Sequence, residues 1–268
     1  MPATYFETPR PRVFGHRGAA GEAPENTLVS FERAAACGAD IFELDVHATR
    51  DGTVVVLHDP TLERTSNGSG AVKDLTWAEV QELDAGYHFT TDGTTYPFRG
   101  RGVRIPSLAE LFARFPDACF NIEVKQAEPE IARDVVQTIF LYQVAPRVVL
   151  AAEHDEIMSQ VRAAAAGSIA TSYSTGEVAD FIFRLQGGAL AEHRPIGRAL
   201  QIPVSFDGIE LVTADSVRAA HSLGLEVHVW TVNDAAEIER LLDLDVDGII
   251  SDLPAVARAV VDRRKKKY

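Results

Sequence analysis

Short apolar segments alternate with amphipathic segments along almost the entire chain. Apolar runs are typical of buried strands, and between them apolar residues recur at helical spacing, as at Val178, Phe181, Ile182 and Leu185. The pattern predicts strands at residues 13–14, 41–46, 54–57, 120–124, 148–151, 169–173, 208–211, 226–230 and 248–250. It predicts helices at residues 27–37, 216–223, 234–242 and 255–262, and one more that begins near Gly176.

Strands that alternate with helices over this length predict an α/β fold with a parallel sheet. A chain of 268 residues suits one closed (β/α)8 barrel of the TIM type, which typically takes about 250 residues. An open doubly wound sheet is the alternative, but the first strand is not followed by the Gly-x-Gly-x-x-Gly turn of nucleotide-binding sheets. We therefore expect a TIM-type barrel.

One long segment interrupts this alternation. Residues 59–106 are polar and rich in turn residues, with one short helix expected at 76–83. A loop of this length within a compact domain is usually functional. We therefore expect a single domain over residues 1–268, with a small insertion at about 59–106 that follows the strand ending near His58.

The chain between the second and third predicted strands is too short for a crossover helix. The Asp-Gly pair at residues 51–52 is a strong signal for a two-residue hairpin turn. With Arg50 opposite Thr53, counting back along the two strands places His58 opposite Asp45. Because directly opposed residues share a face of the sheet, we expect His58 to lie beside Asp45.

Composition and charge narrow the possible partners. The chain is 46% hydrophobic and 24% charged, as in ordinary globular proteins. Its net charge of −13 argues against nucleic-acid binding, which requires a basic surface. The N-terminal segment has no apolar signal core, and no apolar run reaches the ~18 residues of a membrane helix. We therefore expect a cytoplasmic protein without stable membrane insertion, and the sequence leaves its oligomeric state open.

Two other features of the composition indicate little chemistry. Cys37 and Cys119 are the two cysteines, too few for a disulfide framework, and neither has neighbours typical of a metal site. The basic run at residues 263–267 is expected to be a frayed, solvated end. Attraction to an anionic membrane surface is the alternative interpretation of that run.

Two of the predicted strands carry charged residues at alternate positions. Residues i and i+2 of a strand share a face, so Glu43 and Asp45 should point to one side, as should Glu123 and Lys125. Buried carboxylates are costly unless they are paired. A set of three carboxylates favours a hard cation, Mg²⁺ or Ca²⁺, over zinc. We therefore expect one divalent cation at Glu43, Asp45 and Glu123.

Histidine and basic side chains join these carboxylates. His16 and Arg17 follow the first predicted strand, and the catalytic groups of a barrel lie at the carboxyl ends of its strands. His16 and His58 can supply a general acid and a general base, while Arg17 and Lys125 suit phosphate oxygens. The combination indicates phosphoryl chemistry. A buried salt-bridge network is the alternative, but three carboxylates against two cations leave an excess of negative charge.

These residues fall within a series of motifs that closely resembles the glycerophosphodiester phosphodiesterases. The motifs span nearly the whole chain in order: Gly15-His16-Arg17-Gly18, Pro24-Glu25-Asn26-Thr27, Glu43-Leu44-Asp45-Val46, Leu57-His58-Asp59, Leu62-Glu63-Arg64-Thr65, Ile105-Pro106-Ser107-Leu108, Ile122-Glu123-Val124-Lys125, Val229-Trp230-Thr231-Val232-Asn233 and Asp247-Gly248-Ile249-Ile250-Ser251-Asp252. The resemblance implies a phosphodiesterase barrel with a small insertion after His58.

Carried over position by position, the resemblance implies a role for each site residue. It makes His16 and His58 the acid/base pair, Glu43, Asp45 and Glu123 the metal ligands, Arg17 and Lys125 the phosphate ligands, and Trp230 a wall against the glycerol moiety. The implied reaction is the metal-dependent hydrolysis of small-molecule glycerophosphodiesters, such as glycerophosphocholine and glycerophosphoethanolamine, to sn-glycerol 3-phosphate and an alcohol. The headgroup preference and the choice between Mg²⁺ and Ca²⁺ stay open.

The chain departs from the family pattern in two places. After the strand at 148–151 it has Ala152-Glu153-His154 where the family often shows a Ser-Phe pair, and His47 replaces a residue that is more often Gln or another polar type. The departure at 152–154 concerns the shape of the substrate rim and leaves the expected metal site intact.

Two other functions are compatible with the same residues. A lysophospholipase D or a phospholipase C-like enzyme would need an apolar surface near the site, which the aromatic residues at 87–89 and 96–98 could provide. A noncatalytic phosphate-binding module would lack at least one of the histidines or carboxylates, and none is missing.

Three further side chains have a structural and a functional interpretation. Asn26 either caps the helix that begins near Thr27 or lines the site. Gln201 is expected in a loop, and contact with the substrate is the alternative interpretation. Trp230, at the end of a strand, would belong to the core without the family resemblance.

Overall fold

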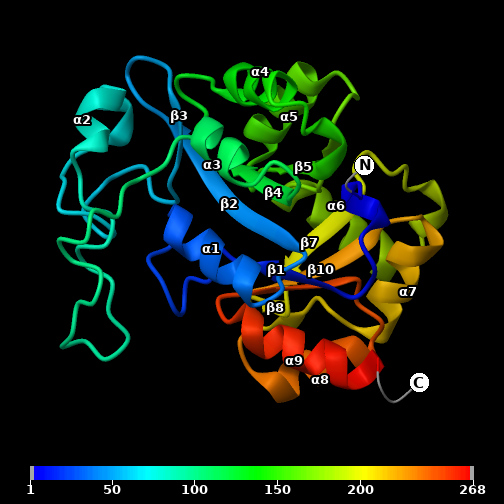
Figure 1. The fold of residues 1–268 in the computed structure, drawn as a ribbon. Coiled ribbons are helices and arrows are strands. Elements are labelled where there is room, and N and C mark those ends of the chain that lie inside the picture. Colours follow the sequence, from blue (N-terminus) through cyan, green and yellow to red (C-terminus); the bar gives the residue numbers. More distant parts are fainter. Residues whose placement is uncertain (1–2, 266–268) are drawn as a thin grey trace.

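Eight parallel strands close around a central axis in the computed structural model, which describes residues 3–265 (Figure 1). They are β1 (Arg12–Gly15), β2 (Ile41–Ala48), β4 (Cys119–Val124), β5 (Val148–Ala151), β6 (Ala170–Thr171), β7 (Ala199–Pro203), β10 (Glu226–Trp230) and β11 (Gly248–Ser251). Their order is β6-β5-β4-β2-β1-β11-β10-β7, and Ser172, directly after β6, forms a parallel bridge with Ala199 of β7. This bridge closes the barrel, which confirms the predicted TIM-type fold and excludes the open sheet.

A ring of helices surrounds the barrel, and each of them lies between successive strands or follows the last one. They are α1 (Leu28–Ala36), α3 (Leu108–Arg114), α4 (Ala132–Leu141), α5 (Asp155–Ala165), α6 (Thr175–Gln186), α7 (Ala214–Ser222), α8 (Ala235–Asp243) and α9 (Pro254–Lys265). Polar caps begin several of them. Before α3, Ser107 and Glu110 form a reciprocal capping box, and before α8 the Asp234 carboxylate accepts two backbone N–H bonds.

The two faces of β2 separate core from site. Phe42, Leu44 and Val46 point outward into the hydrophobic layer between strands and helices, and all are buried. Burial of each such side chain contributes roughly 1.5–3 kcal/mol. Because successive strand residues alternate in direction, this anchoring turns Glu43 and Asp45 into the barrel interior.

The amino-terminal end of the barrel is filled by apolar side chains. A 3-10 turn, η1 (Tyr5–Glu7), brings the fully buried Tyr5 into a cluster with Phe14, Ile41, Val149 and Ile250. The Arg12 guanidinium is also buried there and lies 2.5 Å from a Glu226 carboxylate oxygen. Any site inside the barrel is therefore reached from the opposite end.

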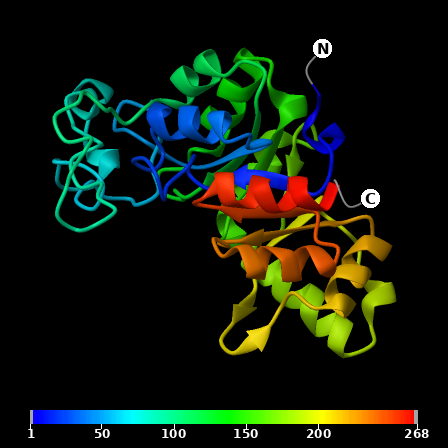
Figure 2. The same ribbon diagram turned by 60° about the horizontal axis from the view of Figure 1, so that its bottom comes forward.

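The insertion has a hydrophobic core of its own beside the barrel. It follows the antiparallel strand β3 (Val54–Val56) and contains η2 (Val72–Asp74) and α2 (Trp77–Gln81). Its apolar cluster consists of Val55, Leu57, Leu62, Val72, Val80, Ala85, Val103 and Ile105. Its two ends meet, because Val56 N–H donates to the Pro106 carbonyl over 2.9 Å. Figure 2 shows this segment in blue-green and cyan, at the far end of the molecule from η1 and the C-terminal end of α9.

The register between β2 and β3 differs from the predicted one. Ala48 pairs with Val54, so residues 49–53 form the loop, and Leu57 N–H donates to the Asp45 carbonyl over 3.0 Å. The predicted two-residue turn fails because the Thr49 hydroxyl accepts from Thr53 N–H and donates to Asp51, which stabilises a wider loop. His58 therefore lies one position beyond the residue opposite Asp45.

The sixth barrel strand along the chain is also not where the pattern placed it. The predicted strand at 208–211 is β9 (Ile209–Glu210), which pairs with β8 (Ser205–Phe206) in a small hairpin outside the barrel. The barrel strand is β7, which contains Gln201, so the expectation of a loop at Gln201 was wrong. An inward-facing glutamine and a proline at its end concealed this strand.

The described C-terminal residues are more ordered than expected. Helix α9 extends to Lys265, and Arg263 and Arg264 pair with Glu239 and Asp243. The prediction of a frayed end was therefore wrong for residues 263–265. Lys266 and Lys267 lie outside the described residues. The remaining 3-10 turns are η3 (Ala145–Arg147) and η4 (Leu190–Glu192). Within residues 3–265, the length and apolar character needed to cross a membrane do not coincide in any helix.

Candidate active site

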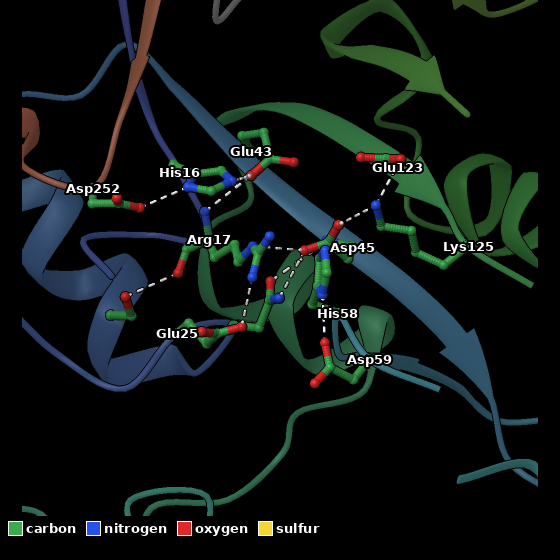
Figure 3. Close-up of polar contacts among 12 residues, drawn as sticks. His16, Arg17, Glu25, Glu43, Asp45, His58, Asp59, Glu123, Lys125 and Asp252 are labelled. Carbon is green, nitrogen blue, oxygen red and sulfur yellow. Dashed lines mark hydrogen bonds and ion pairs between the residues drawn. The ribbon is translucent and has the colours of Figure 1, made fainter. Parts of the chain in front are cut away.

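Three carboxylates from adjacent strands converge inside the barrel. Glu43 and Asp45 lie on β2 and Glu123 on β4, and the strand register sets Asp45 beside Glu123. One carboxylate oxygen from each residue lies within 4.8 Å of the others. Glu43 and Asp45 are almost fully buried. Figure 3 shows the three side chains on one side of the two strands, as their i, i+2 spacing predicts.

Burial and mutual repulsion divide these carboxylates electrostatically. Burial, together with the charge of Asp45, raises the pKa of Glu43 to about 7. Burial and the Asp45 charge also raise the pKa of Glu123. Burial opposes ionisation of Asp45 too, but Arg17 and Lys125 outweigh it and lower the pKa of that carboxyl. Asp45 is therefore the stable anion at the centre of the group.

Two basic side chains face this centre. Lys125 Nζ lies 2.8 Å from Glu123 Oε1 and 3.5 Å from Asp45 Oδ1. Arg17 Nε lies 3.3 Å from Asp45 Oδ2 as an ion pair without hydrogen-bond geometry. Arg17 also has a left-handed backbone, with φ of 49°, and its N–H donates to Glu43 Oε2 over 3.0 Å. The turn after β1 therefore brings both backbone and side chain of Arg17 to the carboxylates.

His16 lies on the β11 side of the site. Its Nδ1 is 2.6 Å from Asp252 Oδ1, and its Nε2 is 3.8 Å from Glu43 Oε2. Burial lowers the pKa of His16, but the bond to Asp252 and the charge of Glu43 outweigh burial and raise it. Asn233 donates to the other Asp252 oxygen over 2.8 Å. Asp252 therefore fixes the imidazole and leaves Nε2 directed at the site.

His58 reaches the same centre from the start of the insertion, despite the shifted register. Its Nδ1 lies 2.6 Å from Asp59 Oδ1, and its carbonyl accepts a bond of 3.0 Å from the His47 ring. In Figure 3 the His58 ring lies between Asp59 and Asp45, and its charge contributes to the lowered pKa of Asp45. The prediction that His58 lies near Asp45 therefore holds, although a bend after the strand achieves it.

Glu25 and Asn26 also contact residues of the site, a placement that the sequence pattern alone did not predict. Thr27, not Asn26, caps α1 by accepting a bond from Ser30 N–H. The Asn26 amide instead donates to Asp45 over 3.0 Å. Glu25 accepts a bond of 2.9 Å from Arg17 Nη1. The partner carboxylates Asp59 and Asp252 were within recognised motifs, yet sequence reasoning gave them no role.

Trp230 and Gln201 lie on neighbouring strands. Trp230 ends β10 and pairs with Pro203 of β7; it is 43% exposed, which excludes a place in the core. The Gln201 amide donates to Asn121 inside the barrel over 2.6 Å. Beyond β5, the departure from the family pattern places Glu153 close enough for its charge to help raise the pKa of Glu123.

The assembled groups suit chemistry at a phosphate ester. Buried carboxylates in excess of their cationic partners favour a bound cation, two histidines can transfer protons, and Arg17 and Lys125 can hold anionic oxygens. The carboxylates project into the barrel from β2 and β4, and His16, Arg17 and Lys125 directly follow the carboxyl ends of β1 and β4, the end at which barrel enzymes carry their active sites. His58 joins them from the residues after β3. Fold and site together define a barrel hydrolase of phosphate esters.

Comparison with known proteins gives the family. The model of the glycerophosphoryl diester phosphodiesterase family matches residues 16–256. A glycerophosphodiester phosphodiesterase of Caldanaerobacter subterraneus subsp. tengcongensis is 35% identical over 248 residues, covering 90% of this chain and 94% of that protein. One of Bacillus altitudinis is 32% identical over 265 residues, covering 96% and 99%. The chain belongs to the glycerophosphoryl diester phosphodiesterase family and is a phosphoric diester hydrolase.

More distant relatives share the fold. The glycerophosphoryl diester phosphodiesterase domain of a Mycobacterium tuberculosis protein superposes with a TM-score of 0.83 at 23% identity, covering 94% of this chain and 99% of that one. An Oleispira antarctica phosphodiesterase, solved in complex with the product sn-glycerol-3-phosphate, has a TM-score of 0.73 at 24% identity, covering 94% and 97%. The mouse lysophospholipase D GDPD1 is 28% identical over 278 residues, covering 91% and 83%.

Proposed function

We propose that this glycerophosphodiester phosphodiesterase hydrolyses water-soluble diesters, such as glycerophosphocholine and glycerophosphoethanolamine, to sn-glycerol 3-phosphate and an alcohol, with one divalent cation. The observation that carries the proposal is the convergence of three carboxylates, two histidines and two basic side chains at one end of the barrel. The product bound by the Oleispira antarctica relative supports a glycerol phosphate ligand.

The donor set fits a divalent metal ion. Glu43, Asp45 and Glu123 offer oxygen ligands within 4.8 Å of one another, and oxygen-only sets suit Mg²⁺ or Ca²⁺. The raised pKa values of Glu43 and Glu123 are what an uncompensated cluster of buried anions produces. When bound, the ion supplies Lewis-acid stabilisation of charge on the phosphate.

Arg17 and Lys125 are the proposed phosphate ligands, and Trp230 is the proposed wall against glycerol. Burial opposes the charge of Lys125, but Glu123 and Asp45 outweigh it and raise its pKa, so the ammonium stays charged over the working pH range. A guanidinium and an ammonium close to the reacting phosphorus stabilise the charge that develops there. The exposed Trp230 ring at the end of β10 offers an apolar face to the carbon chain of glycerol.

His16 is the proposed general base and His58 the proposed general acid. His16 accepts a proton from the nucleophile, either the neighbouring hydroxyl of the substrate or water, and Asp252 stabilises the imidazolium that forms. His58, held by Asp59, donates a proton to the leaving alkoxide. Attack by the substrate hydroxyl yields a cyclic phosphate that water opens afterwards, whereas attack by water yields the product directly.

A lysophospholipid is the second candidate substrate, with lysophospholipase D activity as in the mouse relative. The aromatic residues at 87–89 and 96–98 do not favour this substrate, because they pack on one another and on Arg99. Phe89 packs against Phe98, and Arg99 stacks on Tyr87 and Tyr96. The β8–β9 hairpin does favour it. Phe206 and Ile209 face each other across its two strands and are 61% and 54% exposed, and the hairpin follows the carboxyl end of β7.

The test is release of glycerol 3-phosphate from glycerophosphocholine, glycerophosphoethanolamine and a lysophospholipid. Each substrate is assayed with EDTA and with added Mg²⁺ or Ca²⁺, alongside His16→Ala. We expect release from the soluble diesters that requires a cation and falls by roughly 10²–10⁴-fold in the variant. Turnover of the lysophospholipid alone would transfer the function to lipids. Activity unaffected by EDTA, or retained in His16→Ala, would overturn the proposed mechanism.

A further inference from the structure

A single guanidinium joins two parts of the active site that come from different segments of the chain. Arg64, in the insertion, donates from Nε to Asp59 over 2.6 Å and from Nη2 over 3.0 Å. Its Nη1 and Nη2 donate to the two Glu25 oxygens, each over 2.7 Å. Arg64 therefore holds two carboxylates at once, in the fork geometry that only arginine provides.

Each of these carboxylates holds a side chain of the proposed mechanism. Asp59 bonds His58 Nδ1 over 2.6 Å, and Glu25 accepts from Arg17 Nη1 over 2.9 Å. A continuous series of charged hydrogen bonds thus extends from His58 through Asp59, Arg64 and Glu25 to Arg17. The ends of the series are the proposed general acid and a proposed phosphate ligand.

We propose that Arg64 is a positioning residue for the phosphodiesterase reaction, which sets His58 through Asp59 and Arg17 through Glu25 so that both address the same phosphate. The proposal rests on the functions proposed above for His58 and Arg17. Arg64 touches neither of them directly, so it acts by holding their partners. It also explains how an insertion outside the barrel can carry a catalytic histidine accurately.

A purely structural role predicts something different. The Arg64 side chain is 47% exposed, and exposed ion pairs contribute little to stability. If Arg64 merely attached the insertion to the barrel, its loss would change stability slightly and leave the kinetics of the folded enzyme unchanged. A positioning residue instead changes turnover, because small displacements of reacting groups are costly.

The experiment compares Arg64→Gln and Arg64→Lys with the wild type on glycerophosphocholine. We expect kcat to fall about tenfold to a hundredfold and KM to rise, with circular dichroism unchanged. The lysine variant should recover little, since one ammonium cannot bind two carboxylates bidentately. Added guanidinium should partly restore Arg64→Ala at concentrations that leave the wild type unaffected.

Arg50→Gln is the matched control. Arg50 also joins the barrel to the insertion, through an ion pair of 3.6 Å with Glu79 and a bond of 2.9 Å to the Asp74 carbonyl, and it is 60% exposed. It touches none of the site residues named above. We expect its kcat and KM to equal those of the wild type.

Double-mutant cycles test the route of the effect. Combining Arg64→Gln with Asp59→Asn, and separately with Glu25→Gln, should give losses well below the product of the single losses, because the residues act as one unit. Independent, multiplicative losses would overturn the proposal. So would wild-type kinetics in Arg64→Gln, or equal losses in Arg64→Gln and Arg50→Gln.

His58→Ala and Arg17→Ala separate this proposal from the one it rests on. If both variants lose activity and Arg64→Gln does not, the positioning role alone is wrong. If either keeps full activity, the proposed function of that residue is wrong and the positioning role is overturned with it.

Discussion

The barrel and the insertion both contribute to the active site, and they hold their residues by different means. Glu43, Asp45 and Glu123 project from paired strands and are fixed by backbone hydrogen bonds and by the apolar packing behind them. Asp59 and Arg64 lie outside the strands, 26% and 47% exposed, and are fixed by each other's charge.

The two ways of holding residues differ in their electrostatic energy. Buried strands force like charges together, so the barrel half of the site stores unfavourable electrostatic energy, which the proposed cation would compensate. The insertion half contains matched charges near solvent, where interactions are weaker and are screened by salt. Paired strands can keep an unfavourable arrangement of charges, while a segment outside the strands needs charges that attract.

Removing the central barrel carboxylate should have the largest effect. Asp45→Asn takes a ligand from the acidic cluster and a charge partner from both Arg17 and Lys125. We expect kcat/KM to fall about a thousandfold, with the fold retained because Asn has the same shape. Steady-state kinetics with saturating Mg²⁺ or Ca²⁺ measures the loss. Glu32→Gln, an exposed carboxylate on α1, is the control, and activity above a tenth of the wild type would contradict the central role of Asp45.

The next largest effect is expected from removing the carboxylates that bond the two histidines. Asp252→Asn removes the charged partner of His16, and Asp59→Asn removes that of His58. Both substitutions should reduce kcat by about tenfold to a hundredfold. Asp59→Asn should cost more, because Asp59 also holds Arg64. Only Asp59→Asn should speed limited proteolysis within residues 59–106. Equal proteolysis of the two variants would show that the insertion does not depend on this charge.

The smallest expected effect is on stability: the free energy of unfolding should fall as pH rises. The pKa of Glu43, about 7 in the folded state against its ordinary 4.5, means that between these values the folded state holds a proton that the unfolded chain has lost. Stability of the metal-free protein therefore falls as pH rises through this window, by at most about 3 kcal/mol. Glu43→Gln removes the titrating group, so it should be more stable than the wild type at pH 8 and similar at pH 5.

Urea unfolding in EDTA at the two pH values measures this difference. Glu32→Gln should show no such pH-dependent gain. Lower stability of Glu43→Gln than of the wild type at pH 8 would contradict the stored repulsion. Glu43→Gln should lose activity although its stability at pH 8 rises. Such an inverse relation between activity and stability is expected where an active site requires an arrangement of charges that destabilises the fold.

The barrel half of the site follows from the sequence because strand alternation is local. Glu43 and Asp45 share a face by spacing alone, and the apolar residues between them identify which face is buried. The family motifs also place His16 and His58. Neither argument needs contacts between distant residues.

The insertion half does not follow from the sequence, because its contacts depend on a loop shape. The Thr49 and Asp51 hydrogen bonds that widen the β2–β3 loop compete with the two-residue turn by small energies. The pairing of Arg64 with Glu25 joins residues 39 positions apart, which no local pattern encodes. Strand β7 was missed for a related reason: its inward Gln201 is satisfied by Asn121, a residue on another strand.

The place where the insertion meets the barrel has a consequence for how much the insertion can change. Strand β3, which precedes it, is joined to the residues at its other end by the bond from Val56 to Pro106 and the bridge from Val55 to Ser107. Extra chain between two ends that already touch costs little, about 0.6 kcal/mol for each doubling of length. Residues 66–102 can therefore change in length at a small cost in stability, while Asp59 and Arg64 keep their contacts with the site.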